Sequence, residues 1–275
     1  MVYKLCYDSI ELIKFLKEKF YKNIPNQLWD KNLWMYNKIL DLLDTSFTNP
    51  KHKINNIECY CLKKCDDIED IICKEEDEDK VTYWITGLNI EEGKRFIENI
   101  NKEKKEKQVY ISINNLQLAN IIKNQFDFQI IKRNISYYLI PDGNKKLRYP
   151  ENCKEIYNED VESYKEINHL KIPIQHLRYF AYIEKGKVIS TCGIEPINNK
   201  VEIIGVNTYD LKDRGKGYCK TICRYAIDHT KDDFEVFTCT TTHDNLASRN
   251  IANSLGFKPY VEEYIFRCNS DCNSD

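Results

Sequence analysis

The stretch of sequence that decides the fold runs from Val201 to Cys219 and reads VEIIGVNTYDLKDRGKGYC. Its first part is mostly apolar and β-branched, which predicts a strand that ends at Tyr209. Two glycines then interrupt the chain, and the helical spacing of apolar residues from Gly217 to about His229 predicts a helix. A glycine turn that leads directly into a helix lets backbone N–H groups converge at the positive end of the helix dipole. This junction therefore predicts a binding site for a phosphate or pyrophosphate.

Strands and helices are expected on both sides of this junction. Strands are predicted at 57–62, 68–73, 81–86, 109–113, 129–140, 179–183, 187–194, 201–209 and 234–240, with a last strand that ends at 268. Helices are predicted at 9–20, 33–43, 91–107, 116–125, 161–170, 217–229 and 246–255. The order of these elements indicates a mixed α+β fold.

The chain divides at its strongest cluster of breaker residues, Pro141 to Asn144. We expect an N-terminal domain at 1–140, a C-terminal domain at 145–268 and a disordered tail at 269–275. Both halves contain a strand, an asparagine, a helix, an aromatic residue and a final strand, with Asn115 in the first and Asn245 in the second. A tandem duplication with a period of roughly 130 residues explains this order, and chance similarity of two α+β halves is the alternative.

Composition excludes several classes of protein. Hydrophobic residues make up 42% of the chain, which is enough for buried cores and excludes disorder over most of it. Lys and Arg total 41 against 43 Asp and Glu, without a basic face for nucleic acid. No apolar run approaches the roughly 20 residues that cross a bilayer. Asp8 and Glu11 interrupt the N-terminal pattern, so a secretory signal is not expected. We expect a soluble cytoplasmic protein without membrane or nucleic-acid partners.

Twelve cysteines raise the question of disulfides or metal. Four of them lie within predicted strands or helices of the second half: Cys192, Cys219, Cys223 and Cys239. Four others cluster in the first half: Cys59, Cys61, Cys65 and Cys73. The chain is large enough to fold without disulfides, so we expect reduced thiols. The first-half cluster lacks the paired C-x-x-C spacing of a structural zinc site, so no metal is expected and packed thiols explain it more simply.

On its own, the run from Arg214 to Gly217 is also typical of an ordinary glycine turn with a solvated arginine and lysine. Its context resembles the acyl-CoA-binding core of the GCN5-related N-acetyltransferase (GNAT) superfamily. The phosphate loop of that superfamily reads Arg or Gln, two residues, Gly, one residue, then Gly or Ala, and here Arg214, Gly217 and Cys219 occupy these positions. The cysteine departs from the pattern. Asn245 and the ending Leu255-Gly256-Phe257 resemble the second conserved stretch of the superfamily.

The resemblance implies a GNAT-type fold that binds acetyl-CoA or another acyl-CoA as co-substrate, without a metal. The residues expected to contact CoA are Thr208, Tyr209, Arg214, Gly215, Lys216, Gly217, Tyr218, Cys219, Asn245 and Ser248. In the first half, the segment from Gly87 to Gly93 contains two carboxylates that would repel a pyrophosphate. We therefore expect that the first half does not bind CoA. Instead, it would form a wall of the acceptor site.

A closer resemblance, to the glycine N-acyltransferase family, covers most of the chain. In that family a degenerate N-terminal half precedes a competent C-terminal half. The glutamate six residues before a threonine at the end of a strand is regarded as the general base, and the matching residues here are Glu202 and Thr208. The family's Pro-Glu-Tyr before the arginine is replaced by Leu211-Lys212-Asp213, which weakens the assignment to this family.

The need for a base follows from the nucleophile. An aliphatic amine is protonated at neutral pH, so the free amine is scarce by roughly 10²- to 10³-fold and a positioned base restores it. Glu202 is the candidate, and a surface carboxylate on a half-exposed strand is the alternative interpretation. Glu195, at the end of the preceding strand, and His243, in the loop before Asn245, are further candidates.

Many members of the GNAT superfamily carry a tyrosine seven residues after the asparagine, which protonates the departing thiolate. Ala252 occupies that position here. A thiol with a pKa of about 8.5 is already a tolerable leaving group, so loss of the acid costs less than loss of the base. Tyr209, Tyr218 or water would serve instead.

The resulting hypothesis is an acyl-CoA-dependent N-acyltransferase. It would transfer an acyl group to the amine of a small acceptor, such as the amino acid glycine, by direct attack in a ternary complex. The alternatives are a protein N-acetyltransferase and a non-catalytic module that binds acyl-CoA.

Overall fold

The structure is a computed structural model that describes residues 2–4, 57–64, 67–85, 90–103, 107–141, 148–157, 178–197, 200–234 and 236–268. The helices expected at 9–20, 33–43 and 161–170 and the expected tail at 269–275 lie outside these residues. No helix in the described ranges is long and apolar enough to cross a membrane.

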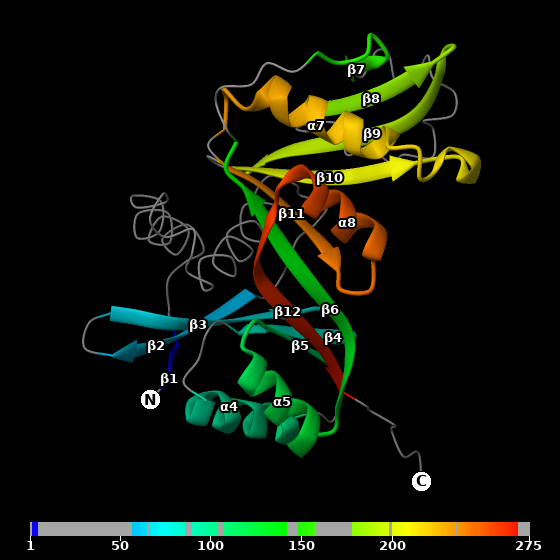
Figure 1. The fold of residues 1–275 in the computed structure, drawn as a ribbon. Helices are drawn as coiled ribbons and strands as arrows, with labels where there is room; N and C mark the ends of the chain where they lie inside the picture. The colour runs from blue at the N-terminus through cyan, green and yellow to red at the C-terminus, as the bar shows by residue number, and fades with distance from the viewer. Residues whose placement is uncertain are drawn as a thin grey trace. The chain divides into compact units, whose positions relative to one another are not determined.

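The chain forms two compact units (Figure 1). One consists of Met1–Asn134 together with Val261–Asp275, and the other of Ile135–Tyr260. This division differs from the expected domains at 1–140 and 145–268, because the chain's C-terminal strand pairs with a strand of the first unit. Tyr264 lies opposite Ile113 in that antiparallel pairing.

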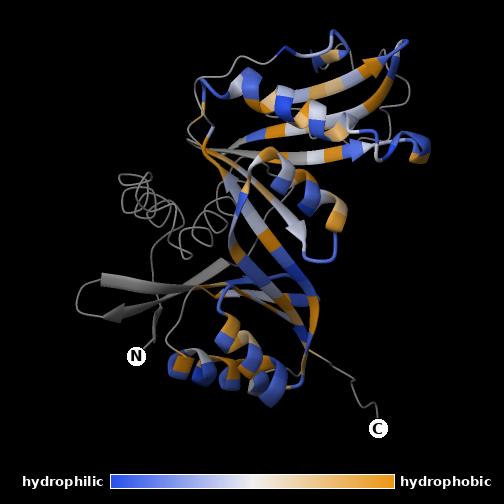
Figure 2. Ribbon diagram, viewed as in Figure 1, coloured by the Kyte–Doolittle hydropathy of each residue, from blue (hydrophilic) through white to orange (hydrophobic). Residues whose placement is uncertain are grey.

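The first unit is built on a sheet with the strand order β1-β2-β3-β4-β5-β12. Its elements are β1 (Val2–Lys4), β2 (Ile57–Lys64), β3 (Asp67–Glu76), β4 (Lys80–Ile85), α4 (Ile90–Glu103), β5 (Gln108–Ile113), α5 (Leu116–Gln125) and β6 (Phe128–Leu139). Strands β4 and β5 run parallel and pair along their whole length, from Lys80 opposite Gln108 to Ile85 opposite Ile113. Helices α4 and α5 carry both hydrophobic and hydrophilic residues (Figure 2), and their apolar residues join the sheet in one core.

The second unit contains a sheet with the strand order β6-β11-β10-β9-β8-β7. Its further elements are β7 (Cys153–Ile156), β8 (Arg178–Glu184), β9 (Lys187–Ile197), β10 (Lys200–Thr208), the 3-10 turn η2 (Leu211–Asp213), α7 (Tyr218–Thr230), β11 (Val236–Thr242), α8 (Leu246–Leu255) and β12 (Lys258–Cys268). Helices α7 and α8 contact each other and share one core with the sheet, which includes Phe180, Ile203 and Phe237. Tyr179, Ala181 and their neighbours form a separate cluster.

The same order of elements occurs twice. The series β4-α4-β5-α5-β6 in the first half matches β10-α7-β11-α8-β12 in the second, and its last three elements are the repeat that the sequence predicted. Both asparagines noted in the sequence cap a helix: the Asn115 side chain accepts hydrogen bonds from the first turn of α5, and that of Asn245 accepts one from Ser248 N in α8. The last strands are exchanged, however. β6 lies next to β11, and β12 lies next to β5.

Candidate functional site

Strands β10 and β11 pair over only part of their length. Lys200–Glu202 lie opposite Val236–Thr238 in parallel register, and among the described residues of these two strands no pair follows Glu202 and Thr238. Along its other edge, β10 contains an irregularity between Ile204 and Asn207, where Gly205 has a φ of +57°. A bulge of this kind bends a strand locally. The two parallel strands thus separate directly after Glu202.

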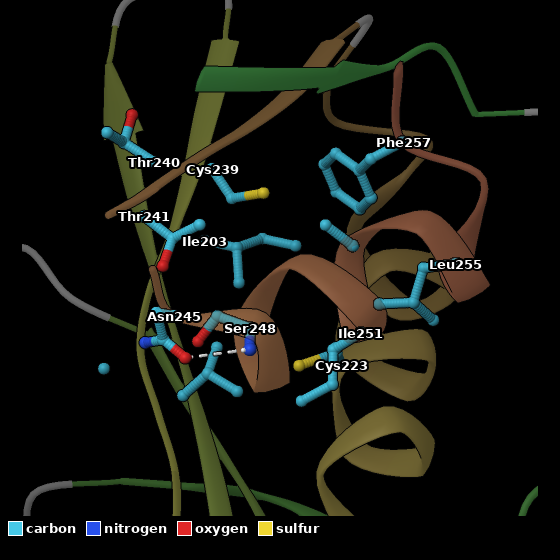
Figure 3. A pocket seen from close by; sticks show the side chains of 13 residues that line it. Ile203, Cys223, Cys239, Thr240, Thr241, Asn245, Ser248, Ile251, Leu255 and Phe257 are labelled. Atoms are coloured by element: carbon cyan, nitrogen blue, oxygen red, sulfur yellow. Dashed lines mark hydrogen bonds between the residues drawn. The ribbon is translucent and has the colours of Figure 1, made fainter. Parts of the chain in front are cut away.

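A cavity of about 350 Å³ lies where the strands separate (Figure 3). Strands β10 and β11 and helices α7 and α8 supply its walls. Gly205, Thr240 and Asn245 are exposed at its rim, whereas Ala252 and Leu255 are buried. The cavity is therefore open on one side and reaches into the core of the second unit.

Gly217 is the N-cap of helix α7 and has a left-handed backbone, with a φ of +85°. Gly215 also has a positive φ, of +78°, and a Cβ added to either glycine would meet nothing within 4 Å. The first N–H groups of a helix have no partner within the helix, and no side chain at Gly217 caps them. The turn therefore presents backbone donors to open space at the positive end of the helix dipole.

Two cations flank this turn. Arg214 and Lys216 are both exposed. Lys216 Nζ lies 2.8 Å from Asp213 Oδ1, and this hydrogen bond raises the pKa of Lys216. Arg214 Nε donates to the carbonyl oxygen of Thr208 over 3.5 Å, which links the turn to the end of β10. An anion bound at the turn would thus meet two positive charges besides the backbone donors.

The structure separates the other expected CoA contacts into two groups. Asn245 and Ser248 line the cavity. Thr208 instead donates its hydroxyl to Ser190 Oγ over 3.3 Å. The Tyr209 hydroxyl hydrogen-bonds with Thr191 Oγ1 over 3.0 Å, and its ring packs against the cluster that contains Tyr179, away from the cavity.

The two residues that follow Gly217 are held by neighbours in the second unit. The ring of Tyr218 lies 4.7 Å from that of Tyr182, centroid to centroid. Contact with the Cys223 thiol, together with burial, raises the pKa of Cys219. Cys219 is thus a neutral thiol inside the start of α7, and it leaves the turn free of negative charge.

The three candidate bases lie on different elements. Glu202 occupies the last paired position of β10, opposite Thr238 on β11 and opposite Glu195 on β9. The side chain of Glu202 lies outside the described residues. Glu195 is half-buried. Burial raises the pKa of Tyr179, and the nearby Tyr209 and Glu195 raise it further. The backbone carbonyl of His243 accepts a hydrogen bond from Arg249 Nη1 at 2.8 Å, which fixes the loop before α8.

Apart from Ser248, which was an expected CoA contact, the sequence did not assign the residues of α8 that line the cavity. Ser248, Ile251, Ala252 and Leu255 line it from one face of α8. These residues are spaced by three, one and three positions, which places them on a single face of a helix. The sequence therefore did indicate that they share one face. Gly205 was a second signal, because an isolated glycine within a strand pattern indicates a bulge.

The described cysteines are free thiols. Cys73 is buried on β3, and its backbone lies opposite that of Cys59 on β2. Cys65 lies outside the described residues, as do the side chains of Cys59 and Cys61. Among the residues that the structure describes, no three His, Cys, Asp or Glu side chains are grouped to hold a metal ion.

The first unit differs from the second at the corresponding place. Strands β4 and β5 do not separate, because all of their residues are paired. Glu91 and Glu92 stand in the first turn of α4, where carboxylates would oppose a bound phosphate. The separation of strands and the glycine turn next to cations thus occur together in the second unit.

Residues 147–257 match the acetyltransferase (GNAT) family. No curated protein matches the sequence. A GNAT acetyltransferase from Colwellia psychrerythraea has a similar structure, with 13% identity, a TM-score of 0.53 and coverage of 97% of this chain and 98% of that one. A GCN5-related N-acetyltransferase from Sphaerobacter thermophilus has 9% identity and a TM-score of 0.56, with coverage of 97% and 95%.

A tandem GNAT protein from the clavulanic acid biosynthesis pathway also has a similar structure, with a TM-score of 0.56 at 9% identity, and the similarity covers 97% of each chain. At such identities these likenesses concern the fold, and they agree with the repeated order of elements found here. The similarity to the glycine N-acyltransferase family in particular stays a prediction. The segment 147–257, which contains the glycine turn and the cavity, is thus the part of the chain that is similar to the GNAT family of acetyltransferases.

Proposed function

We propose that this protein is an acyl-CoA-dependent N-acyltransferase that transfers an acyl group to the amine of a small acceptor, such as an amino acid. The observation that carries the proposal is the separation of β10 and β11 beside the glycine turn of α7, with a cavity between the strands. This arrangement combines an anion site with a slot that leads into the core. Acyl-CoA has the matching parts, a pyrophosphate followed by an extended arm that ends in a thioester.

The pyrophosphate would bind at the turn from Arg214 to Cys219. The N–H groups at the start of α7 would donate to its oxygens, and Arg214 and Lys216 would supply positive charge. Asp213, which pairs with Lys216, limits the net positive charge of the turn. The backbone donors therefore contribute most of the specificity for phosphate in this proposal.

The pantetheine arm would lie between the separated strands. Beyond Glu202 no residue pair joins the described parts of β10 and β11, so an extended ligand could lie between their facing edges. The arm contains two amides, which can pair with these edges as an added strand would. Asn245 and Ser248, at the start of α8, line the same slot. The thioester would then lie near the point where the two strands separate.

Glu202 is the proposed general base. It occupies the last paired position of β10 and β11, immediately before Ile203 on the cavity wall. The acceptor nitrogen would attack the carbonyl carbon of the thioester, and its proton would pass to Glu202 directly or through one water molecule. Backbone N–H groups of β10 near its bulge would stabilise the oxyanion. The C–S bond then breaks, and CoA leaves as a thiolate that takes up a proton.

The proton for the thiolate would come from water or from Tyr218 at the start of α7. Ala252 cannot supply it, although it lines the cavity. The Tyr209 hydroxyl is an unsuitable donor in this arrangement, because it hydrogen-bonds with Thr191 away from the cavity. A CoA thiol with a pKa of about 8.5 leaves without strong acid catalysis.

An assay of CoA release tests the proposed activity. It would combine the protein with short-chain and aromatic acyl-CoAs and a panel of amino acids, other small amines and a lysine-containing peptide. Release of free thiol that depends on a small amine supports the proposal. Release only with the peptide would indicate a protein acceptor. A rise in melting temperature with acetyl-CoA, but no release with any acceptor, would indicate a binding module without activity.

A further inference from the structure

The cavity has two chemically different ends. At its rim, Thr240 and Asn245 are exposed and Thr241 is half-buried, so this end is polar and reaches solvent. Its inner wall is apolar: Ala252 is 4% exposed, Leu255 is 3% exposed and Phe257 is 4% exposed. Figure 3 shows the threonines and Asn245 on one side of the cavity, with Leu255 and Phe257 on the other.

The inner wall also carries no charge. The side chain of Ile203 points into the cavity from β10, and the sulfur of Cys239 points into it from β11 (Figure 3). Cys223 lines it from α7, and a hydrogen bond with the Cys192 thiol together with burial raises the pKa of Cys223 well above its ordinary value. A neutral thiol behaves as a small apolar group. The inner end therefore offers a surface that suits hydrocarbon and gives water few hydrogen-bond partners.

Ala252 determines how much room this end has. It lies between Ile251 and Leu255 on the cavity face of α8, and its methyl group is the smallest side chain of that face. A larger residue at this position would extend directly into the cavity. The small side chain leaves room next to the place where the proposed thioester lies.

We propose that the inner end of the cavity binds an acyl chain longer than acetyl, so that the preferred co-substrate is a medium-chain acyl-CoA. This inference rests on the proposed function, because it takes CoA to bind with its phosphates at the α7 turn. With the phosphates held there, the acyl group is the end of the ligand that reaches deepest. The polar arm then meets the polar rim, and the hydrocarbon meets Ile203, Leu255 and Phe257.

A series of ligands on the unaltered protein tests the inference without knowledge of the acceptor. Binding of CoA, acetyl-CoA, butyryl-CoA, hexanoyl-CoA and octanoyl-CoA would be measured by titration calorimetry. Each methylene that becomes buried should tighten binding by about fourfold, until the cavity is filled. Hexanoyl-CoA should therefore bind at least tenfold more tightly than acetyl-CoA. Its binding should also have a more negative heat-capacity change, the signature of buried apolar surface.

The variant Ala252→Leu fills the inner end. This variant should weaken the binding of hexanoyl-CoA at least tenfold and change the affinity for CoA less than twofold. The control is Asn253→Leu, which places the same leucine on the neighbouring exposed residue of α8. This control should bind every ligand as the unaltered protein does. Melting temperatures of both variants establish that they are folded, and the ligand series decides the inference even if Ala252→Leu does not fold.

Two results would overturn the inference, and they differ in what they imply for the proposed function. If CoA binds but all chain lengths bind equally, or if Ala252→Leu weakens CoA as much as hexanoyl-CoA, the cavity holds only the pantetheine arm. The proposed function then stands and the acyl site fails. If neither CoA nor any thioester binds, both proposals fail.

Discussion

Gly217 directs the first N–H groups of α7, because its φ of +85° is one that glycine adopts without steric cost. A side chain at this position would act in two ways. It would strain the backbone by about 1–3 kcal/mol, and it would stand where the proposed pyrophosphate approaches the helix. The surrounding space is open, so the folded protein should tolerate the side chain itself.

We expect Gly217→Val to weaken CoA binding at least tenfold in calorimetry, with only a modest fall in melting temperature. Gly186→Val is the matched control. Gly186 has a φ of +76° in the turn between β8 and β9, and a Cβ there would also meet nothing within 4 Å. The control variant has similar backbone strain, but it adds no side chain at the start of α7. Equal losses of affinity in both variants, or no loss in Gly217→Val, would contradict the phosphate site.

The proposed base gives a prediction about pH. Glu202→Gln keeps the size and hydrogen-bonding capacity of the side chain but removes its basicity. Near pH 7 the rate should fall by about 10²-fold or more, because the amine is then mostly protonated. The loss should shrink as pH rises toward the pKa of the amine, since free amine becomes abundant. Full pH–rate profiles with one amine acceptor provide the measurement.

Glu195→Gln and His243→Ala serve as comparisons for this experiment. Glu195 is the neighbour of Glu202 across β9 and β10, and His243 precedes α8. Both variants should keep the shape of the pH–rate profile. An intact profile in Glu202→Gln together with a flattened one in either comparison would assign the base to that other residue.

Residues with a strong local signature could be predicted from sequence. The loop from Arg214 to Gly217 and the helix cap at Asn245 depend on spacing and on glycine or asparagine chemistry, which a single sequence displays. The inner wall of the cavity could not be assigned in the same way. Ile251 and Leu255 have the spacing of any buried helix face, and whether such a face meets another side chain or a cavity depends on tertiary packing.

At the scale of elements, helices α5 and α8 have the bounds expected from sequence, because an asparagine precedes each and their apolar spacing is regular. Strand β7 was missed, since its four residues are too few to show alternation. The pairing of β12 with β5 was also not foreseen. A strand pattern specifies which face is apolar, but it does not specify the partner strand.

Strand β7 is held to β8 partly by an ion pair. Arg178 Nε and Nη2 donate to the two oxygens of Glu155 over 2.7 and 3.0 Å. This hydrogen bonding lowers the pKa of Glu155 in the folded protein. A carboxyl group whose pKa is lowered by folding adds stability above its unfolded pKa, and that stability is lost as pH falls through the folded pKa.

We therefore expect Glu155→Gln to destabilise the protein by about 1 kcal/mol at pH 7, a modest value because Arg178 is partly exposed. The difference from the unaltered protein should shrink as pH falls through the lowered pKa of the folded state, below which the carboxyl group is protonated in both states. Urea unfolding from pH 3 to pH 8 would measure it. Glu151→Gln, at an exposed position before β7, is the control. A pH-independent difference would mean that Glu155 acts through packing rather than charge.

At the scale of the whole molecule, the two halves repeat one order of elements but differ at the parallel strand pair. In the first unit β4 and β5 remain paired over their full length, whereas β10 and β11 separate after Glu202. Two parallel strands that stay paired leave no slot for an extended ligand between them, whatever charges lie nearby. The duplicated fold therefore predicts one functional site rather than two.

Calorimetric titration should accordingly give one CoA per chain. Gly217→Val should weaken that single site, and no second site of comparable affinity should remain. Replacing both Glu91 and Glu92 by glutamine removes the repulsion at the start of α4, yet it should not create a second site, because β4 and β5 stay paired. Two CoA molecules per chain, or a site that survives Gly217→Val and strengthens when the two glutamates are replaced, would place CoA in the first unit. Repulsion rather than strand pairing would then be what distinguishes the two halves.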